Sequence, residues 1–341
     1  MILDTSIVSL SHIAFFAVAF ILSYNLLSWL LNRPDPILRS VPKKSAYYAG
    51  SIVIGAVALL AYIVLEDPLL KVGLLGASFL CLLIGIIDEN RPLSPQAQLA
   101  WQVVIATVAV AWGWTIRYVS DPYSSGVIDL ATGSIGPILL PGSILAVAWL
   151  VLLMNSINWL DGVDGQAGGV GVVALLTLSG VSLLPSTQDS LTLTLSLIGA
   201  GAVLGFLIWN FPPARVYLGT SGSWFLGLFI GMVAIIGGGK IVTTLLVLAL
   251  PVIDMALVIV QRLAQKKAPW IGDRENHLHF RLVSWGWSHR AIAIAAISLT
   301  SLLGLAAITL QTSEKIIALI IASVMLGAVT LHLFYRQSKQ V

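Results

Sequence analysis

The densest group of chemically active side chains lies between Asn155 and Gly169, in the sequence NSINWLDGVDGQAGG. It holds two carboxylates, Asp161 and Asp164, and an amide at Asn158 besides that of Asn155. Apolar runs long enough to cross a bilayer flank this segment on both sides. A carboxylate at the bilayer centre costs about 2.5–3.5 kcal/mol on insertion scales. We therefore expect both aspartates to lie at a membrane face or in a watered cavity, where they would be functional.

The spacing of this segment predicts a turn between two helices. Its amides and carboxylates recur every third residue, so each neighbouring pair would share a helix face. Gly162 and Gly165 are poor helix formers, however, and we expect the first helix to end near Trp159. Exposed backbone N–H groups at the start of the next helix favour an anionic ligand. A tight turn with capping aspartates is the alternative interpretation.

Two further segments carry polar groups beside apolar runs. In GIIDENRPLSPQAQLAWQ, the adjacent carboxylates of Asp88 and Glu89 either raise each other's proton affinity or hold a divalent cation together. In WNFPPARVYLGTSGSWFLG, glycines and serines around Ser221 precede a helix, and Arg215 adds a fixed charge. That second pattern suits phosphate. A solvated helix end and a plain loop are the respective alternatives.

A long basic segment near the C-terminal end has the sequence KKAPWIGDRENHLHFRLVSWGWSHR. Arg274 and Arg281 flank His277 and His279; arginine forks bind phosphate, and histidine can place a phosphate or carry a proton. A zinc site is disfavoured, because no Cys or Glu completes a ligand set at the usual spacings. An ordinary basic loop is the alternative. For Asp254, inside an apolar run, structural and catalytic roles are equally supported.

The composition is that of a membrane protein. Of the 341 residues, 58% are hydrophobic and only 10% are charged, whereas ordinary soluble domains have about 25% charged residues. Runs near 20 residues can span the hydrocarbon core as helices. The sequence predicts eleven such spans in one domain covering residues 1–341. They lie at about 8–31, 46–65, 69–87, 98–118, 142–160, 166–184, 190–209, 223–237, 240–261, 289–310 and 315–335.

The loops between these runs predict the orientation. Of the 18 Lys and Arg residues, 14 fall on one side of the predicted membrane, and this bias marks the cytoplasmic side. It places the C-terminus inside, the N-terminus outside, and every acidic or histidine segment named above on the cytoplasmic face of the inner membrane. An alternating stretch at about 125–140, with a turn at Gly133, predicts a small external β-hairpin. No basic helix or stacking aromatics indicate nucleic-acid binding.

In this order and spacing, the motifs are similar to those of the polyprenyl-phosphate N-acetylhexosamine-1-phosphate transferases. The resemblance covers about residues 80–295, from IGIIDENRPLSPQAQLAWQ to GDRENHLHFRL, and includes LPVIDMALVIVQRL. The last motif looks more like the branch that uses UDP-N-acetylglucosamine than like the muramoyl-pentapeptide branch. The resemblance implies an all-α membrane enzyme that starts lipid-linked cell-envelope glycans. Mg²⁺, with Mn²⁺ as the alternative ion, a UDP-sugar and a polyprenyl phosphate are implied as partners, and a homodimer is left open.

The resemblance also implies roles for individual residues. Asp88 matches the residue proposed to activate the acceptor phosphate, with Glu89 beside it, and Asp164 completes the catalytic set. Asp161, Asp164 and Thr220 match the metal positions. The implied substrate-binding residues are Lys43, Asn155, Asn158, Asp161, Asn210, Thr220, Ser221, Arg274, His277, His279 and Arg281.

The sequence departs from the family pattern at several positions. Thr220 stands where the family normally has a metal-binding Asp, so we expect weaker Mg²⁺ binding or a larger share for the remaining carboxylates. Glu89 replaces a usual Asp, Gln166 a usual Leu, and Phe280 a frequent His. These departures leave a second hypothesis open, a family member without catalysis that binds lipid phosphate or serves as a scaffold. A transporter is a third hypothesis, and it predicts inverted repeats and broken helices.

Overall fold

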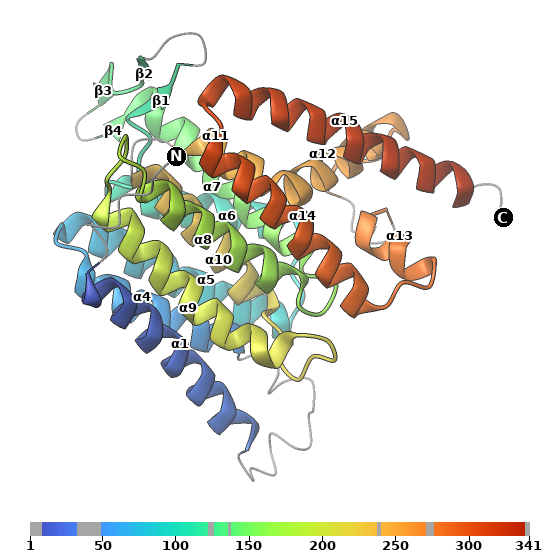
Figure 1. The fold of residues 1–341 in the computed structure, drawn as a ribbon, viewed down its shortest axis with the longest axis horizontal. Coiled ribbons are helices and arrows are strands. Elements are labelled where there is room, and N and C mark those ends of the chain that lie inside the picture. Colours follow the sequence, from blue (N-terminus) through green and yellow to red (C-terminus); the bar gives the residue numbers. More distant parts are fainter. Residues whose placement is uncertain are drawn as a thin grey trace.

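The structure is a computed structural model, and it describes residues 9–32, 49–121, 126–135, 138–236, 240–270 and 276–337. Lys43 and Arg274 lie outside the described residues. The described chain is a helical bundle with two small β-pairs at one end (Figure 1). Its longer helices are α1 (Leu10–Leu31), α4 (Ala49–Val64), α5 (Pro68–Asn90), α6 (Pro95–Ala111), α7 (Leu140–Leu160), α8 (Gln166–Ser182), α9 (Ser190–Asn210), α10 (Gly219–Ile236), α12 (Ala249–Ala264), α14 (His289–Thr309) and α15 (Thr312–Gln337).

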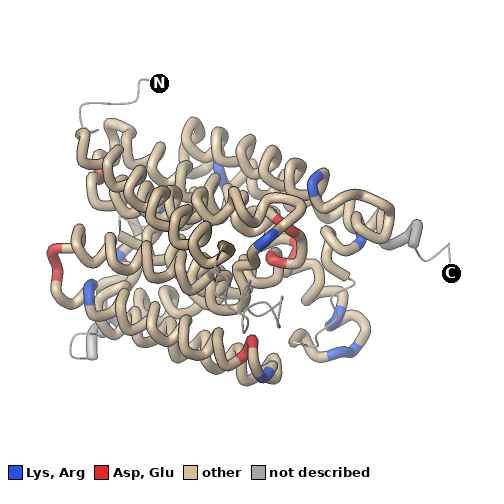
Figure 2. Tube along the Cα trace, turned by 90° about the horizontal axis from the view of Figure 1, so that it is seen from below, with Lys and Arg blue, Asp and Glu red and all other residues tan. Residues whose placement is uncertain are grey.

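The predicted all-α membrane class is confirmed. In the described part of the chain, seven helices are long and apolar enough to cross a membrane, and the bent pair α11 (Ile241–Val247) and α12 raises the number to eight. Three shorter apolar helices, α4, α6 and α8, have 16, 17 and 17 residues. Each of the eleven predicted runs overlaps at least one of these helices. Charged residues gather mostly at the ends of the helices (Figure 2).

The run predicted as one span at 240–261 is not a single helix. Helices α11 and α12 meet at Leu248 with a bend of 79°. Pro251, in the first turn of α12, has no N–H to donate to the carbonyl of Val247, so the α-helical hydrogen-bond ladder cannot continue across this point. The bend changes the direction of the segment that carries Asp254.

The external hairpin was predicted with the wrong partners. Strand β2 (Val127–Asp129) pairs antiparallel with the earlier β1 (Tyr118–Ser120), and β3 (Ser134–Ile135) pairs with β4 (Ile138–Leu139). Gly133 has a φ of +91° and connects the two pairs instead of closing one hairpin. Alternating apolar residues indicate a strand, but they do not specify which neighbour it pairs with.

Helix α10 is the centre of the bundle. It packs against α4, α5, α7, α8 and α9. In its apolar 18-residue stretch, 83% of the residues are buried, whereas the corresponding share is 11% for α15 at the periphery. Small residues bring the backbones together: a Cβ on Gly201 of α9 would lie 2.3 Å from the carbonyl oxygen of Phe16 in α1. Such contacts are the usual means by which membrane helices pack closely. A glycine also allows close backbone contact where α5 meets α10.

Candidate active site

The inner end of α5 is held against the first turn of α10. Gly85 allows this contact, because a Cβ there would lie 2.3 Å from the Cα of Ser221. Asp88 and Glu89 follow Gly85 by three and four residues, so they project from the same side of α5, one turn further on. The helix ends at Asn90, and α6 begins immediately after Ser94, which caps it. This corner fixes both carboxylates beside the start of α10.

Asp88 and Glu89 accept hydrogen bonds from neutral donors. The Oδ1 atom of Asp88 accepts from the N–H of Leu93 (2.8 Å) and from the side chain of Gln98 (3.0 Å), and its Oδ2 accepts from the hydroxyl of Thr220 (2.7 Å). Glu89 accepts from the hydroxyl of Ser221 at 3.0 Å and from the N–H of the same residue at 3.3 Å. The predicted residues Thr220 and Ser221 therefore contact the predicted acidic pair directly.

The segment 161–165 is a turn between α7 and α8, as predicted. Gly165 adopts a φ of +75° and donates its N–H to the Oδ1 of Asn210 at 2.9 Å. The amide of Asn210 in turn donates to the carbonyl of Val216 at 2.8 Å, and the N–H of Ala214 donates to Asp164 at 3.2 Å. Asn210 thus ties the acidic turn to the segment 211–216. Both ends of its amide are used by the backbone, so its role is to position the turn.

Asp161 and Asp164 are weakly bonded by comparison. Among the described residues, Asp161 has no hydrogen-bond or ion-pair partner, and Asp164 has only the N–H of Ala214 and the ring of His289, whose Nδ1 lies 3.5 Å away. Burial raises the pKa of Asp161 well above its usual range, and the negative charge of Asp164 raises this pKa further. A carboxylate pair of this kind accommodates a cation readily.

The histidine segment lies against this acidic turn. A Cβ on Gly162 would lie 2.5 Å from the Nε2 of His279 and 2.7 Å from the ring of Phe280, so only a glycine fits there. His279 is the second residue of α13 (Leu278–Ser284) and is 2% exposed. Its Nε2 has no hydrogen-bond partner in the described part of the chain, and burial lowers the pKa of His279 to about 4. His279 is therefore a neutral ring next to the aspartates at neutral pH.

The ring of His277 stacks on that of His279, with centroids 5.6 Å apart, and meets Trp159 edge-on at 5.2 Å. The Nδ1 of His277 lies 2.8 Å from the Oδ2 of Asp254 on the bent helix α12. The N–H of Leu278 donates to the other oxygen of Asp254, also at 2.8 Å. Asp254 thus joins the site, which the sequence had left undecided.

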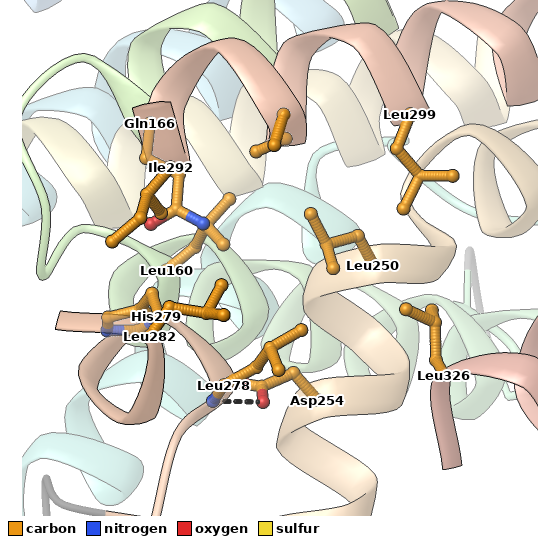
Figure 3. A pocket seen from close by; sticks show the side chains of 12 residues that line it. Leu160, Gln166, Leu250, Asp254, Leu278, His279, Leu282, Ile292, Leu299 and Leu326 are labelled. Carbon is orange, nitrogen blue, oxygen red and sulfur yellow. Dashed lines mark hydrogen bonds between the residues drawn. The ribbon is translucent and has the colours of Figure 1, made fainter. Parts of the chain in front are cut away.

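A cavity of about 100 Å³ lies beside these residues, lined by side chains from α7, α8, α12, α13, α14 and α15 (Figure 3). Its walls are mostly aliphatic. Gln166, His279 and Asp254 provide its polar groups, with Gln166 and His279 towards the same end. The Oε1 of Gln166 is buried and has no hydrogen-bond partner among the residues that the structure describes. Leu160 and Gln166, which flank the acidic turn, form part of the cavity wall.

Three predicted site residues use their polar groups in contacts within the chain. The amide of Asn155 contacts Gln102 of α6 and the carbonyl of Val151, within the helices. Arg281 is 1% exposed and binds Asn276 and Gln261, so its guanidinium holds the histidine segment to α12. Asn210, as described above, bridges two backbone segments.

The predicted residue Asn158 is connected to the start of α10 by hydrogen bonds. Asn158 donates to Ser223 at 2.9 Å, and Ser223 donates to the carbonyl of Thr220, which links the end of α7 to the start of α10. Sequence reasoning missed Gln98, which binds Asp88, and His289, which lies beside Asp164. Gln98 carried a signal, since it lies ten residues after Asp88, one turn into the helix opened by Pro95.

The carboxylates of the acidic turn suit a magnesium ion that is bound partly by the protein and partly by the phosphates of a substrate. In the described part of the chain, no three His, Cys, Asp or Glu side chains gather to hold a metal by themselves. Mg²⁺ characteristically takes one or two protein carboxylates together with water and substrate phosphates. Asp161 and Asp164 fit that requirement. They are close enough for the charge of Asp164 to raise the pKa of Asp161, and they have few hydrogen-bond donors among the described residues. Thr220 is engaged by Asp88, and its predicted role as a metal ligand has no support from this contact.

Comparison with known proteins identifies the family. The family model described as Glycosyl transferase family 4 matches residues 71–238. A Bacillus subtilis protein, "Probable undecaprenyl-phosphate N-acetylglucosaminyl 1-phosphate transferase", is 30% identical over 283 residues, which are 81% of this chain and 76% of that protein. The chain belongs to glycosyl transferase family 4. The resemblance inferred from the motifs is thereby confirmed.

Two further relatives of this family 4 protein carry related names. The "Decaprenyl-phosphate N-acetylglucosaminephosphotransferase" of Mycolicibacterium smegmatis is 30% identical over 63% of this chain and 57% of its own length. The "Undecaprenyl-phosphate alpha-N-acetylglucosaminyl 1-phosphate transferase" of Thermotoga maritima is 29% identical over 65% of this chain and 66% of its own length. The family match covers the acidic pairs and Thr220, whereas Asp254 and the histidine segment lie beyond residue 238.

Proposed function

We propose that this family 4 protein transfers N-acetylglucosamine-1-phosphate from UDP-N-acetylglucosamine to a polyprenyl phosphate. An oxygen of the acceptor phosphate forms a bond to the β-phosphorus of the nucleotide sugar, and the bond from that phosphorus to the bridging oxygen breaks, which releases UMP. The product is a lipid-diphosphate sugar that starts a cell-envelope glycan. The names of the relatives support both the sugar phosphate and the polyprenyl phosphate.

The observation that carries the proposal is the contact series at one end of the bundle. Asp88 binds Thr220, Asn158 reaches the same turn of α10 through Ser223, and the turn after α7 lies against His279. These groups lie where apolar helices end, so a lipid phosphate from the bilayer and a nucleotide from water can meet there. Displacement at phosphorus depends on positioning and charge neutralisation more than on covalent catalysis by the protein.

The residues have distinct roles in this proposal. Asp88, held on both oxygens, accepts the proton of an acceptor phosphate or orients it, and Glu89 is fixed beside it by Ser221. Asp161 and Asp164 would hold Mg²⁺, which would neutralise the charge of the diphosphate when bound. His279 and Phe280 pack on the acidic turn and exclude water from it. Lys43 and Arg274, outside the described residues, are further candidates for nucleotide contacts.

The proposed orientation has eleven spans, the N-terminus outside, the C-terminus inside and the site at the cytoplasmic face of the inner membrane. It is supported by the distribution of Lys and Arg, 14 of 18 on one side. Cysteine labelling tests it, since Cys81 is the one native cysteine and is buried. A cysteine at Arg91 should react with a membrane-impermeant reagent only in inside-out vesicles. A cysteine at Asp67, at the other end of α5, should react only in right-side-out vesicles.

The direct experiment offers purified protein in detergent a polyprenyl phosphate, Mg²⁺ and one of three UDP-sugars, and measures UMP release. We expect release with UDP-N-acetylglucosamine, and a loss of at least about 100-fold in Asp88→Asn, as for removal of one pre-organised polar group. Asp67→Asn is the matched control: it caps the opposite end of α5, and Asn caps helices as well as Asp. Substrate binding without UMP release by any UDP-sugar would instead support a non-catalytic family member.

A further inference from the structure

We propose that Asp254 is a positioning residue that fixes the tautomer and ring orientation of His277, so that the unprotonated Nε2 faces the nucleotide sugar. This inference rests on the proposed function, in which the histidine segment contacts the sugar diphosphate. It assigns a role to an intramembrane carboxylate whose purpose the motifs left open.

The carboxylate of Asp254 has two neighbours, and each occupies one oxygen. Its Oδ1 accepts the backbone N–H of Leu278, as the dashed line in Figure 3 shows, and its Oδ2 lies 2.8 Å from the Nδ1 of His277. Asp254 is 7% exposed and His277 is 5% exposed, so water does not replace either contact easily. Because an ionised carboxylate only accepts hydrogen bonds, the Nδ1 of His277 must carry the proton.

The ring of His277 is fixed by three contacts together. Asp254 holds its Nδ1, the Trp159 ring meets it edge-on, and His279 stacks on its face. The Nε2 of His277 has no hydrogen-bond partner among the described residues. In its neutral form, a ring with its proton on Nδ1 presents a lone pair at Nε2, which accepts a hydrogen bond from a hydroxyl or amide N–H of the ligand.

The bend in the ninth apolar run gives this carboxylate its place. Pro251 ends the hydrogen-bond ladder from α11, and α12 leaves at 79° with Asp254 in its second turn. A straight continuation would point this segment elsewhere. The cost of a buried carboxylate is offset by its two hydrogen bonds to the segment 277–278.

Asparagine at this position would reverse the tautomer. Its single carbonyl oxygen would stay with the N–H of Leu278, because a backbone N–H cannot become an acceptor. Its NH₂ group would then face the Nδ1 of His277 and would require a lone pair there. The proton would move to Nε2, and the ring would present a donor to the ligand where it now presents an acceptor.

The test is nitrogen-15 NMR of histidine-labelled protein in detergent, which distinguishes the two tautomers, with His277→Gln used to assign the signal among the five histidines. We expect the Nδ1–H tautomer in the wild type and the Nε2–H tautomer in Asp254→Asn. UMP release should fall at least about 10-fold, as for the loss of a group that orients a functional histidine, and the KM for polyprenyl phosphate should stay unchanged. Asp254→Glu should restore the tautomer and part of the activity.

Gln261→Ala is the matched control, because Gln261 also joins α12 to this segment, through Arg281, without touching His277. It should leave the tautomer unchanged. An Nε2–H tautomer in the wild type overturns the proposal, even if Asp254→Asn fails to fold. So does a loss of activity in Asp254→Asn with the tautomer unchanged, which would show a structural role only. The NMR result does not depend on turnover, so a failure of the proposed function is recognised separately.

Discussion

Two pairs of carboxylates lie at the same end of the bundle, and the protein binds them differently. Asp88 and Glu89 together accept five hydrogen bonds, all from neutral donors on α6, on α10 and on the connection before α6. Asp161 accepts none from the described residues, and Asp164 accepts one, from Ala214. The first pair is held in a fixed geometry before any ligand arrives. The second pair is short of partners among the described residues, which suits the metal-binding role that we propose for it.

The largest effect should come from removing a charge from the unpartnered pair. Asp161→Asn should lower UMP release at least about 100-fold and abolish the rise in melting temperature on adding Mg²⁺. Without divalent cations the same variant should melt no lower than the wild type, because it removes a partly buried carboxylate that has no partner among the described residues. If Mg²⁺ stabilises Asp161→Asn as much as the wild type, Asp161 does not hold the ion.

Acid should reveal the buried neutral histidine beside that pair. The pKa of His279 is about 4 in the folded protein and about 6.5 when unfolded, so the unfolded chain binds more protons between these values. The stability contributed by His279 is thus complete above about pH 6.5 and is lost as the pH falls toward 4, by about 3 kcal/mol at most.

The measurement compares melting temperatures of the wild type and His279→Gln in cation-free buffer from pH 7.5 to 4.5. The difference in melting temperature between the two proteins should shrink as the pH falls. Because the other titrating groups are the same in both proteins, this difference reports on His279 alone. His332→Gln, at an exposed position on α15, is the control and should follow the wild type at every pH. A constant difference would mean that His279 is not buried as a neutral ring.

A single methyl group should disturb the pre-organised pair. Gly85→Ala places a Cβ 2.3 Å from the Cα of Ser221, so α5 and α10 must separate. We expect a loss of about 1–3 kcal/mol, as for overpacking, and a fall in UMP release, because the donors to Glu89 move away. Gly55→Ala, where the new Cβ meets nothing within 4 Å, should be neutral or slightly stabilising. Equal melting temperatures for the two variants would contradict this packing.

The smallest effect should come from one hydroxyl. Thr220→Val keeps the shape and removes the donor to Asp88, which should cost about 1 kcal/mol, while Thr220→Ser should resemble the wild type. Thr220→Asp sharpens the comparison further. It sets a second carboxylate against Asp88, so its melting temperature should fall without Mg²⁺ and recover with it. If Mg²⁺ does not change the melting temperature of Thr220→Asp, the two carboxylates do not share a cation.

Local sequence chemistry predicted much of this arrangement because the signals were themselves local. The glycines at 162 and 165 end one helix and open the next, and the prolines at 92 and 95 place Asp88 at a corner. Partners that lie far apart in the sequence could not be predicted in this way. Nothing near Asn210 shows that its amide is used by Gly165 and Val216, and nothing near Arg281 shows that Gln261 and Asn276 hold it. These residue types suit ligands and backbone equally, so only the packed chain assigns them.

By itself, the sequence determined the membrane class, the positions of the apolar helices, the acidic and histidine segments and the family, because hydropathy and motif spacing are properties of short stretches. Only the tertiary structure decided which carboxylates are bonded and which are not, that β2 pairs with β1, and that the bend at Leu248 brings Asp254 to His277. The physical reason is that partnership depends on the direction in which a helix leaves a break and on how closely small residues let backbones approach. Neither quantity is contained in the pattern of a single segment.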